Sequence, residues 1–520
     1  MNRPRHRAPL TRRQLLVSAG LGGAVVLGGG AFKVLREDSR ADDIRAAAAA
    51  RARVAQEGMS VVMICLDSVR ADHVGAYASD ANRPRNQVRT ASLDELARQS
   101  LRFRHARPEQ LPTGPTRRSI HTGIRTFPAD GWSPDADSPR IYGWQRIPRT
   151  QTTLAELFKA AGHRTAMVTD NTWMLKPSWA RFAGTWDDFV GIPGQVQQSL
   201  PRGRSIDDVD VSRYLPEGLR TLSPRKAETN EEVIARYVVN RGRRTKEEDW
   251  FAPRVFNAAS KWLERNGDAP EGFFLFIDSF DPHEPWDPPR KYVARYDDPD
   301  PRVADAIFPV YGRDDYLSPR EIQRMKALYA GELTMTDHWL GVFLERLDEL
   351  GLSERTIVVV FTEQGVSHDD RGFVGKSPSQ MYAEMVDVPL LIRHPEGRAA
   401  NTATGFLTQL HDLAPTVLAA AGIPVPEAME GIDLTPLLAA TPPAQERDVQ
   451  TAAYNDYAWA GDAKLSLIAT GRGRNRRLFD RVKDPGERRN LAAERPGDAD
   501  RLWKRILEDA GEEEALPRYA

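Results

Sequence analysis

Short apolar runs that end in polar side chains recur along the chain from residue 59 onward. The runs SVVMICLD (60–67), EGFFLFIDSFDPH (271–283) and TIVVVFTEQG (356–365) have this form, and VPLLIRHP (388–395) is a fourth. Continuous apolar runs of this length are typical of central strands in a parallel sheet that is buried on both faces. The pattern therefore predicts several buried parallel strands.

Helical spacing appears between these runs. Residues 90–100 predict a helix with Thr90 or Ser92 as its N-cap, and residues 153–170 predict a helix, a stop at Gly162 and then a strand. Residues 329–350 predict a long amphipathic helix that ends at Gly351, and residues 411–422 predict another helix. Alternating strands and helices predict an α/β fold, with a large and mainly parallel sheet covered by helices on both faces.

The remaining segments divide the chain. Residues 193–257 are charged with poor periodicity, and we interpret them as an insertion near the entrance of the site. Residues 441–448 (TPPAQERD) resemble a linker, followed by two short strand-like runs and a charged helix. We expect an N-terminal segment 1–56, a main domain 57–438 and a small C-terminal α+β subdomain 439–520.

The N-terminal segment has the order of an export signal. Basic residues precede a weakly apolar stretch over 15–32, and the string TRRQLL resembles a twin-arginine signal with Arg12 and Arg13 as the pair. No clear cleavage site follows, so the segment could also remain as a membrane anchor, and the stretch to residue 58 reads as a helical or loose linker. We expect an exported protein that is periplasmic, extracellular or anchored facing outside.

Composition excludes some classes of function. Seventy-two basic residues balance 73 acidic ones, so no long-range field would hold a polyanion, and nucleic acid is not an expected partner. The single cysteine, Cys65, allows no intramolecular disulfide, and its apolar surroundings predict a buried strand residue. No Gly-x-Gly-x-x-Gly follows the first strand, which argues against a dinucleotide-binding enzyme.

Polar side chains stand at or just after the ends of the predicted strands. Asp67, His283, Glu363 and Gln364 all occupy such positions. Ligands of open α/β sheets bind outside the carboxyl ends of the strands, so we expect these side chains to converge on one rim.

Several segments, in their order along 59–495, resemble the sulfatase-like family of the alkaline phosphatase superfamily. VVMICLDSVRADHVGAY is similar to the family's opening strand and its metal-binding aspartate, here Asp67. TGPTRRSIHTG is similar to its nucleophile signature, with Thr113 at the nucleophile position and Pro115 and Arg117 matching. LFDRVKDPGERRNLA is similar to the family's C-terminal signature.

Two further segments extend the resemblance. FFLFIDSFDPHEPWDPP is similar to the loop that carries a substrate-facing histidine, here His283. Residues 356–395 are similar to the second metal segment, where Glu363, Gln364 and Gly365 replace the usual Asp-His-Gly or Asp-Asn-Gly and Lys376 matches an active-site lysine.

Departures from the family pattern bear on mechanism. Classical members convert the signature Cys or Ser to formylglycine, but threonine cannot form that aldehyde. Ser68 stands where many members have a second aspartate, Thr116 replaces the signature serine, and TDNTWM (169–174) lacks the usual Lys and His. The resemblance therefore implies an ester hydrolase or transferase that uses Thr113 itself.

The implied chemistry needs a cation and an activated hydroxyl. Asp67, Glu363, Gln364 and Thr113 would hold one divalent ion, and oxygen ligands favour Ca²⁺, Mg²⁺ or Mn²⁺ over zinc. Thr113 would attack the ester, and Arg117 would stabilise charged oxygens. His283 and Lys376 would stabilise the leaving oxygen, with His283 as a candidate general acid.

Each of these residues also has a structural interpretation: Thr113 as a simple helix N-cap, for example, or Gln364 as a hydrogen-bonding residue. His73, His121, His368 and Asp337 are treated as structural. Three functions remain open: a phosphate or phosphonate ester hydrolase or transferase, a sulfate ester hydrolase with unmodified Thr113, and a catalytically inactive binding protein. The substrate is expected to be a small-molecule, lipid or glycan ester.

Overall fold

The computed structural model describes residues 30–51, 54, 58–78, 88–128 and 133–511. The predicted twin-arginine pair, Arg12 and Arg13, lies outside the described residues. None of the described helices is both long enough and apolar enough to cross a membrane.

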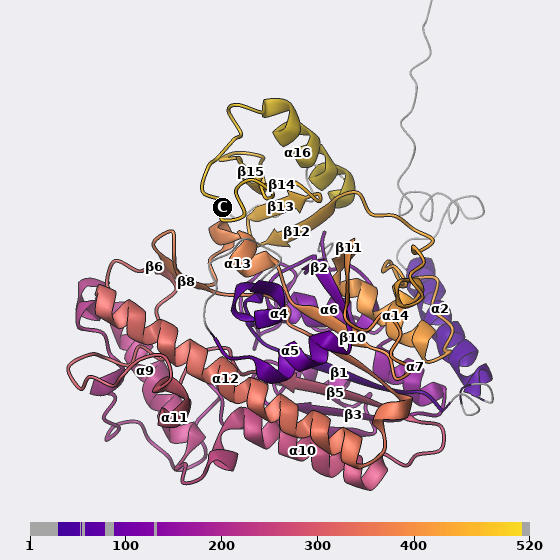
Figure 1. Cartoon of the computed structure of the whole chain (residues 1–520), viewed down its shortest axis with the longest axis horizontal. Helices are drawn as coiled ribbons and strands as arrows, with labels where there is room; N and C mark the ends of the chain where they lie inside the picture. Colours follow the sequence, from indigo (N-terminus) through magenta and orange to yellow (C-terminus); the bar gives the residue numbers. More distant parts are fainter. Residues whose placement is uncertain (1–29, 52–53, 55–57, 79–87, 129–132, 512–520) are drawn as a thin grey trace, which may run out of the picture.

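An eight-stranded sheet forms the centre of the molecule, in the order β11-β2-β10-β7-β1-β5-β3-β4 (Figure 1). All neighbouring strands run parallel except β10, which is antiparallel to both β2 and β7. The strands are β1 Ser60–Leu66, β2 Leu101–Arg107, β3 Arg164–Thr169, β4 Asp188–Gly191, β5 Phe273–Ser279, β7 Thr356–Phe361, β10 Leu390–Arg393 and β11 Thr402–Gln409. The predicted α/β fold with a mainly parallel sheet is confirmed.

Alternate residues of β1 face two separate apolar cores. Val62 and Ile64 belong to one core, and Val61 and Met63 to the other, so every side chain of this strand is buried. Helices α5 (Ala91–Arg98), α10 (Phe251–Asn266) and α12 (Pro319–Glu349) pack into the first core, whereas α6 (Thr113–Thr122), α7 (Leu154–Ala160) and α14 (Leu413–Ala420) pack into the second. Helices therefore cover both faces of the sheet (Figure 1).

The long helix α12 begins ten residues before the predicted start at Tyr329. Ser318 caps it through a capping box with Glu321, and Pro319 occupies the first turn, where its missing N–H costs nothing. The helix ends at Glu349 with Leu350 as its C-cap, and Gly351 follows with the positive φ of 68° that favours glycine. The sequence S-P-R-E carries this start signal, but the apolar periodicity becomes regular only further along.

Within the described residues, seven further helices and one small three-stranded sheet complete the main body. Helix α9 (Pro224–Arg241) arises from the predicted insertion, and α2 (Gly30–Ala49) is the helical form of the predicted linker. A hydrogen bond of 2.9 Å from Thr152 to Asp43 ties α2 beside α7. The short elements are α4 Gly75–Ala78, α8 Ala180–Ala183, α11 Arg290–Val293, α13 Ala383–Val386, α15 Thr435–Leu438, β6 Gly312–Arg313, β8 Ser367–Asp370 and β9 Phe373–Gly375.

The C-terminal region forms a four-stranded antiparallel sheet under one helix, where the sequence predicted only two strands. It contains β12 Gln450–Tyr454, β13 Tyr457–Gly461, β14 Leu465–Thr470, β15 Arg477–Asp480 and α16 Pro496–Ala510. The sheet and α16 stand above the main body in Figure 1. Leu111 N–H, in the segment that leads into α6, donates to Ala453 C=O at 2.9 Å. The sheet thereby supports the chain just before Thr113.

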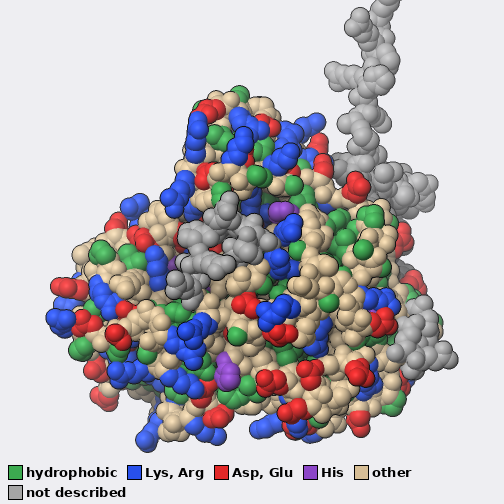
Figure 2. Space-filling view, in the orientation of Figure 1, with side chains coloured by type: hydrophobic (Ala, Val, Ile, Leu, Met, Phe, Trp, Pro, Cys, Tyr) green, Lys and Arg blue, Asp and Glu red, His purple; other side chains and the backbone are tan. Residues whose placement is uncertain are grey.

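On the face shown in Figure 2, basic and acidic side chains are interspersed. This distribution agrees with the near-zero net charge of −1.

Candidate active site

Three carboxylates meet where the central strands β5, β1 and β7 end. Asp67 directly follows β1, Glu363 follows β7, and Asp278 is the penultimate residue of β5, in register with Cys65 of β1. All three side chains are completely buried. The parallel register brings residues between about 85 and 300 positions apart in sequence to one rim, as the positions of Asp67 and Glu363 at strand ends predicted.

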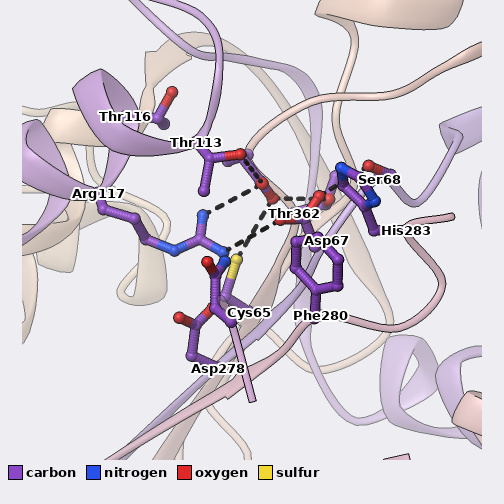
Figure 3. Close-up of polar contacts among 12 residues, drawn as sticks. Cys65, Asp67, Ser68, Thr113, Thr116, Arg117, Asp278, Phe280, His283 and Thr362 are labelled. Carbon is purple, nitrogen blue, oxygen red and sulfur yellow. Dashed lines mark hydrogen bonds and ion pairs between the residues drawn. The ribbon is translucent and has the colours of Figure 1, made fainter. Parts of the chain in front are cut away.

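Thr113 stands at the first position of α6, next to this rim (Figure 3). Its Oγ1 lies 3.5 Å from Glu363 Oε1. The N-cap of α6 is Pro112, so Thr113 does not serve as the simple N-cap that was its alternative interpretation. The hydroxyl instead points toward the acidic rim.

Gly114 lets the helix start approach a tryptophan. A Cβ at Gly114 would lie only 2.6 Å from the indole of Trp144. Trp144 is 2% exposed, and its Nε1 has no hydrogen-bond partner. A residue without a side chain beside Thr113 is therefore required by packing, which gives a physical reason for the glycine in the TGPTR motif.

Arg117 lies one turn beyond Thr113 and reaches into the three carboxylates (Figure 3). Its Nη2 is 2.6 Å from Asp278 Oδ1 and 3.7 Å from Asp67 Oδ2, and its Nη1 is 3.4 Å from Glu363 Oε1. A guanidinium that is fully buried among carboxylates is fixed in place, because its removal would leave uncompensated charge in the interior.

Charge is unevenly balanced at this rim, with one guanidinium for three carboxylates. Burial and the neighbouring Glu363 raise the pKa of Asp67 well above its ordinary value. Burial also acts to raise the pKa of Glu363, but Arg117 and Asp67 outweigh it and the pKa is lowered. Ser68, at a positive φ of 67°, donates its hydroxyl to Asp67 Oδ1 at 2.7 Å. Negative charge therefore resides on Glu363, beside Thr113.

Oxygen donors at the rim fit a hard divalent cation. Asp67 Oδ2 and both amide atoms of Gln364 are buried and without a hydrogen-bond partner. The Asp67 and Glu363 carboxyls share a hydrogen bond, and a cation bound there would take the place of the shared proton. The described residues contain no cluster of three or more His, Cys, Asp or Glu side chains that could hold a metal ion, so a cation at this rim would also need amide and hydroxyl oxygens as ligands.

Lys376 and His283 share one partner, Glu284. Lys376 Nζ lies 3.0 and 2.9 Å from the two carboxylate oxygens of Glu284 and 3.1 Å from the Tyr311 hydroxyl. His283 Nδ1 contacts the Glu284 backbone carbonyl at 2.6 Å, so Nδ1 carries the proton and donates it. Glu284 thus orients both residues.

Burial, with a smaller contribution from the charge of Lys376, lowers the pKa of His283 to about 4, against the opposing effect of Glu284. The ring is therefore neutral at pH 7. His283 can act as the predicted general acid only if the charge of a bound ester raises this pKa. The side chain of Lys376 is buried rather than solvated, and its amino group lines the same cavity as His283.

A cavity of about 750 Å³ opens onto this rim. Thr113, Gln364, His283 and Lys376 line it, whereas Asp67, Arg117 and Glu363 lie behind the lining, fully buried. The predicted insertion also lines the cavity, through Gln197 and residues of α9. A substrate in this cavity meets the threonine hydroxyl first, with the acidic rim beyond it.

The structure brings together every residue predicted for the site, and it adds others. Asp278, Glu284, Tyr311, Trp144 and Tyr454 were missed. Asp278 had the same local signal as Asp67, a carboxylate at the end of a buried strand. The family resemblance, however, assigned no role to Asp278. The two aromatic residues Tyr311 and Tyr454 carry no local signal, because their contacts with Lys376 come from distant segments.

Other polar residues treated as structural lie elsewhere. His121 is enclosed by the rings of Phe182, Trp186 and Phe276. Asp337 accepts hydrogen bonds from the first N–H groups of α5. Cys65 is fully buried, as predicted, and burial raises the pKa of its thiol, which makes it a poor nucleophile.

Comparison with known proteins identifies the family. The profile described as Sulfatase matches residues 60–423, well over half of the chain and all of the rim described above. The chain belongs to the sulfatase family. A second profile, described as N-sulphoglucosamine sulphohydrolase, C-terminal, matches residues 371–509. Membership of the sulfatase family makes this chain an ester-hydrolysing enzyme.

Its relatives within the family are distant. An ulvan-active sulfatase of Formosa agariphila is 24% identical over 83% of this chain and 76% of its own length. A multifunctional alkaline phosphatase superfamily protein of Trinickia caryophylli is 23% identical, over 75% of this chain and 78% of its own. The phosphonate monoester hydrolase of Agrobacterium radiobacter has the same fold, with a TM-score of 0.63 and 18% identity over 88% of this chain and 96% of its own.

Proposed function

We propose that this sulfatase-family enzyme cleaves or transfers a phosphate or phosphonate ester with the Thr113 hydroxyl as its nucleophile. The observation that carries the proposal is the position of Thr113: at the cavity floor, with Oγ1 3.5 Å from Glu363 Oε1. A hydroxyl needs a neighbouring base or a cation for activation, and Glu363 is the nearest anionic group.

The first step forms one bond and breaks another. Thr113 Oγ attacks phosphorus, its proton passes to Glu363, and the bond between phosphorus and the leaving oxygen breaks. The leaving oxygen departs beside His283 and Lys376 and takes up a proton from the Lys376 ammonium group. Water then hydrolyses the phosphorylated threonine, or an acceptor alcohol takes its place in a transferase.

Arg117 supplies fixed positive charge behind the reacting group. Its guanidinium is held by Asp278 at 2.6 Å, so it needs no reorganisation when negative charge develops on the ester oxygens. Lys376 plays the corresponding part near the leaving oxygen, held by Glu284.

Asp67, Glu363, Gln364 and Thr113 would hold one divalent cation. A bound cation of this kind supplies Lewis acidity, which lowers the pKa of the hydroxyl and neutralises a non-bridging ester oxygen. Purified protein should show a higher melting temperature with excess Ca²⁺, Mg²⁺ or Mn²⁺ than after chelation, and Gln364→Leu should reduce that increase. A ligand at about 100 times its Kd stabilises by ~2.7 kcal/mol. Identical melting curves with and without each ion would contradict the cation site.

A sulfate ester is the alternative substrate, because the relative from Formosa agariphila is an ulvan-active sulfatase. The structural neighbour from Agrobacterium radiobacter is a phosphonate monoester hydrolase, and threonine cannot form the aldehyde used by classical sulfatases. These two facts support a phosphate or phosphonate ester as the proposed substrate.

Matched aryl phosphate, phosphonate and sulfate esters test the proposal. Turnover should be highest on a phosphorus ester, Thr113→Ala should reduce kcat by at least about a thousandfold, and Thr113→Ser should retain part of it. Intact mass of rapidly quenched enzyme should reveal a phosphoryl adduct that Thr113→Ala lacks. Equal activity in Thr113→Ala would contradict the role of the hydroxyl, and no turnover on any ester would favour a binding protein.

We also propose export through the twin-arginine signal at Arg12 and Arg13, on the sequence pattern alone. Replacing both arginines with lysine should leave the protein inside the cell, as cell fractionation would show. Unchanged export of that variant would contradict the proposal.

A further inference from the structure

The cavity above Thr113 is much larger than a phosphate or sulfate group. Its volume is about 750 Å³, and six aromatic side chains line it: Trp144, Trp173, Phe280, Phe308, Tyr311 and Tyr454. The rings of Trp144 and Trp173 pack edge to face, with 5.0 Å between the ring centroids. Aromatic and apolar walls of this extent favour an apolar or aromatic body on the substrate.

Charge along the cavity is of one sign. Three cationic side chains line it, Lys376, Arg225 and Lys226, and no Asp or Glu is present among its described lining residues. Lys376 is neutralised by Glu284 at 2.9 Å. Arg225 and Lys226 are exposed and have no ion-pair partner within the described part of the chain. Two unpaired cations therefore remain, both in the first turn of α9.

Helix α9 is tied to the segment of the cavity lining that contains Phe308. Asn230 Nδ2 donates to the Phe308 backbone carbonyl at 2.8 Å, and the nearby Tyr311 hydroxyl contacts Lys376 Nζ at 3.1 Å. These contacts connect the helix that carries the two cations to the wall beside the reacting site. The helix that carries the two cations is thus anchored to the cavity that Thr113 also lines.

We propose that Arg225 and Lys226 form a second anion-binding subsite, for a carboxylate, sulfate or phosphate at the far end of the substrate. The inference rests on the proposed function, since it places the scissile ester at Thr113. The preferred substrate class is then an ester with an aromatic or apolar body and a remote anionic group. Arg225 and Lys226 bind this group and take no part in bond cleavage.

Two aryl esters that differ only at the remote end test the subsite. One carries a free carboxylate, and the other carries its neutral methyl ester, on the same scissile group. The native enzyme should have a KM roughly threefold to tenfold lower for the carboxylate, an advantage that high salt reduces. Arg225→Ala/Lys226→Ala should abolish that difference and leave kcat unchanged on both substrates.

Arg220→Ala/Lys261→Ala is the matched control, because these two exposed cations lie outside the cavity lining. It should retain the preference for the carboxylate. Equal KM values for the two esters in the native enzyme, or an unchanged preference in Arg225→Ala/Lys226→Ala, would overturn the subsite.

Failure of the subsite can be separated from failure of the proposed function. Calorimetric binding of the carboxylated aryl product and of its methyl ester to Thr113→Ala requires no turnover. Tighter binding of the carboxylate, lost in Thr113→Ala combined with Arg225→Ala/Lys226→Ala, supports the subsite even without catalysis. Equal binding of both compounds overturns it, whether or not the native enzyme is active.

Discussion

Arg117 and Asp278 form a fully buried ion pair, with 2.6 Å between Nη2 and Oδ1. Thr169 Oγ1 donates to the other Asp278 oxygen at 3.1 Å, so both oxygens of this carboxylate are used. Asp278 thereby determines where the guanidinium stands relative to Thr113. The pair joins the nucleophile helix α6 to the central strand β5.

Asp278→Asn should reduce kcat strongly and should reduce the melting temperature only a little. The amide keeps most of the shape but removes the charge that holds Arg117, which would then move toward Glu363 and Asp67. A displacement of about 1 Å at a catalytic group can cost roughly a hundredfold in rate. Steady-state kinetics together with thermal melting measure both effects.

Asp300→Asn is the control for this substitution, because its ion pair with Arg302 lies at the surface. It should change neither quantity. Native kcat in Asp278→Asn would show that Asp278 does not position Arg117.

The pair of Lys376 and Glu284 should show strong coupling. Lys376→Met leaves a buried carboxylate without its cation, which should destabilise the fold by about 3–5 kcal/mol. Lys376→Met/Glu284→Gln removes both charges and should recover part of that loss. Chemical denaturation of both single variants and the double variant measures the coupling. Additive effects would mean that the two side chains do not depend on each other.

Gly114→Ala should disturb the site through Trp144. Its Cβ would lie 2.6 Å from the indole, and overpacking of this kind typically costs about 1–3 kcal/mol. Because Gly114 follows Thr113, activity should fall with stability. At Gly497 a Cβ would meet no atom within 4 Å, so Gly497→Ala should be nearly neutral. Melting temperature and kcat of the two variants provide the comparison.

Asp337 should make the stability of the fold depend on pH. Burial raises the pKa of Asp337 to about 7, although it accepts N–H groups of Ser92 and Leu93 at 3.0 and 2.8 Å. In the unfolded chain this carboxyl has a pKa of about 3.9. At pH values between these two pKa values, the folded state binds more protons than the unfolded chain. The stabilisation that protonated Asp337 contributes is therefore complete below pH ~4 and is lost as the pH rises through about 7.

Asp337→Asn should therefore show a flatter dependence of melting temperature on pH between about 4 and 7 than the native protein. The difference between the two curves isolates this group from other titrating residues. Parallel curves over that range would contradict the assignment to Asp337.

The sequence by itself determined five of the eight strands of the main sheet and the family resemblance. It also singled out Asp67, Thr113, Arg117, His283, Glu363 and Lys376 as candidates for the site, because each lies within a local pattern. Apolar runs that end in a charge are visible in one dimension, since burial on both faces imposes them. The capping box at Ser318 is also a local pattern. It was not used to predict the start of the helix, because the regular apolar spacing begins further along the chain.

Only the tertiary structure decided which partners these residues have. The register of β1 against β5 and β7 brings Asp278 and Glu363 to the same guanidinium, and a distant loop supplies Glu284 to Lys376. Such contacts join segments about 90 to 250 residues apart, and no spacing along the chain encodes them. The pKa values of the carboxyl groups at the rim follow from those contacts and from burial, because the pKa of a group removed from water depends on its few charged neighbours.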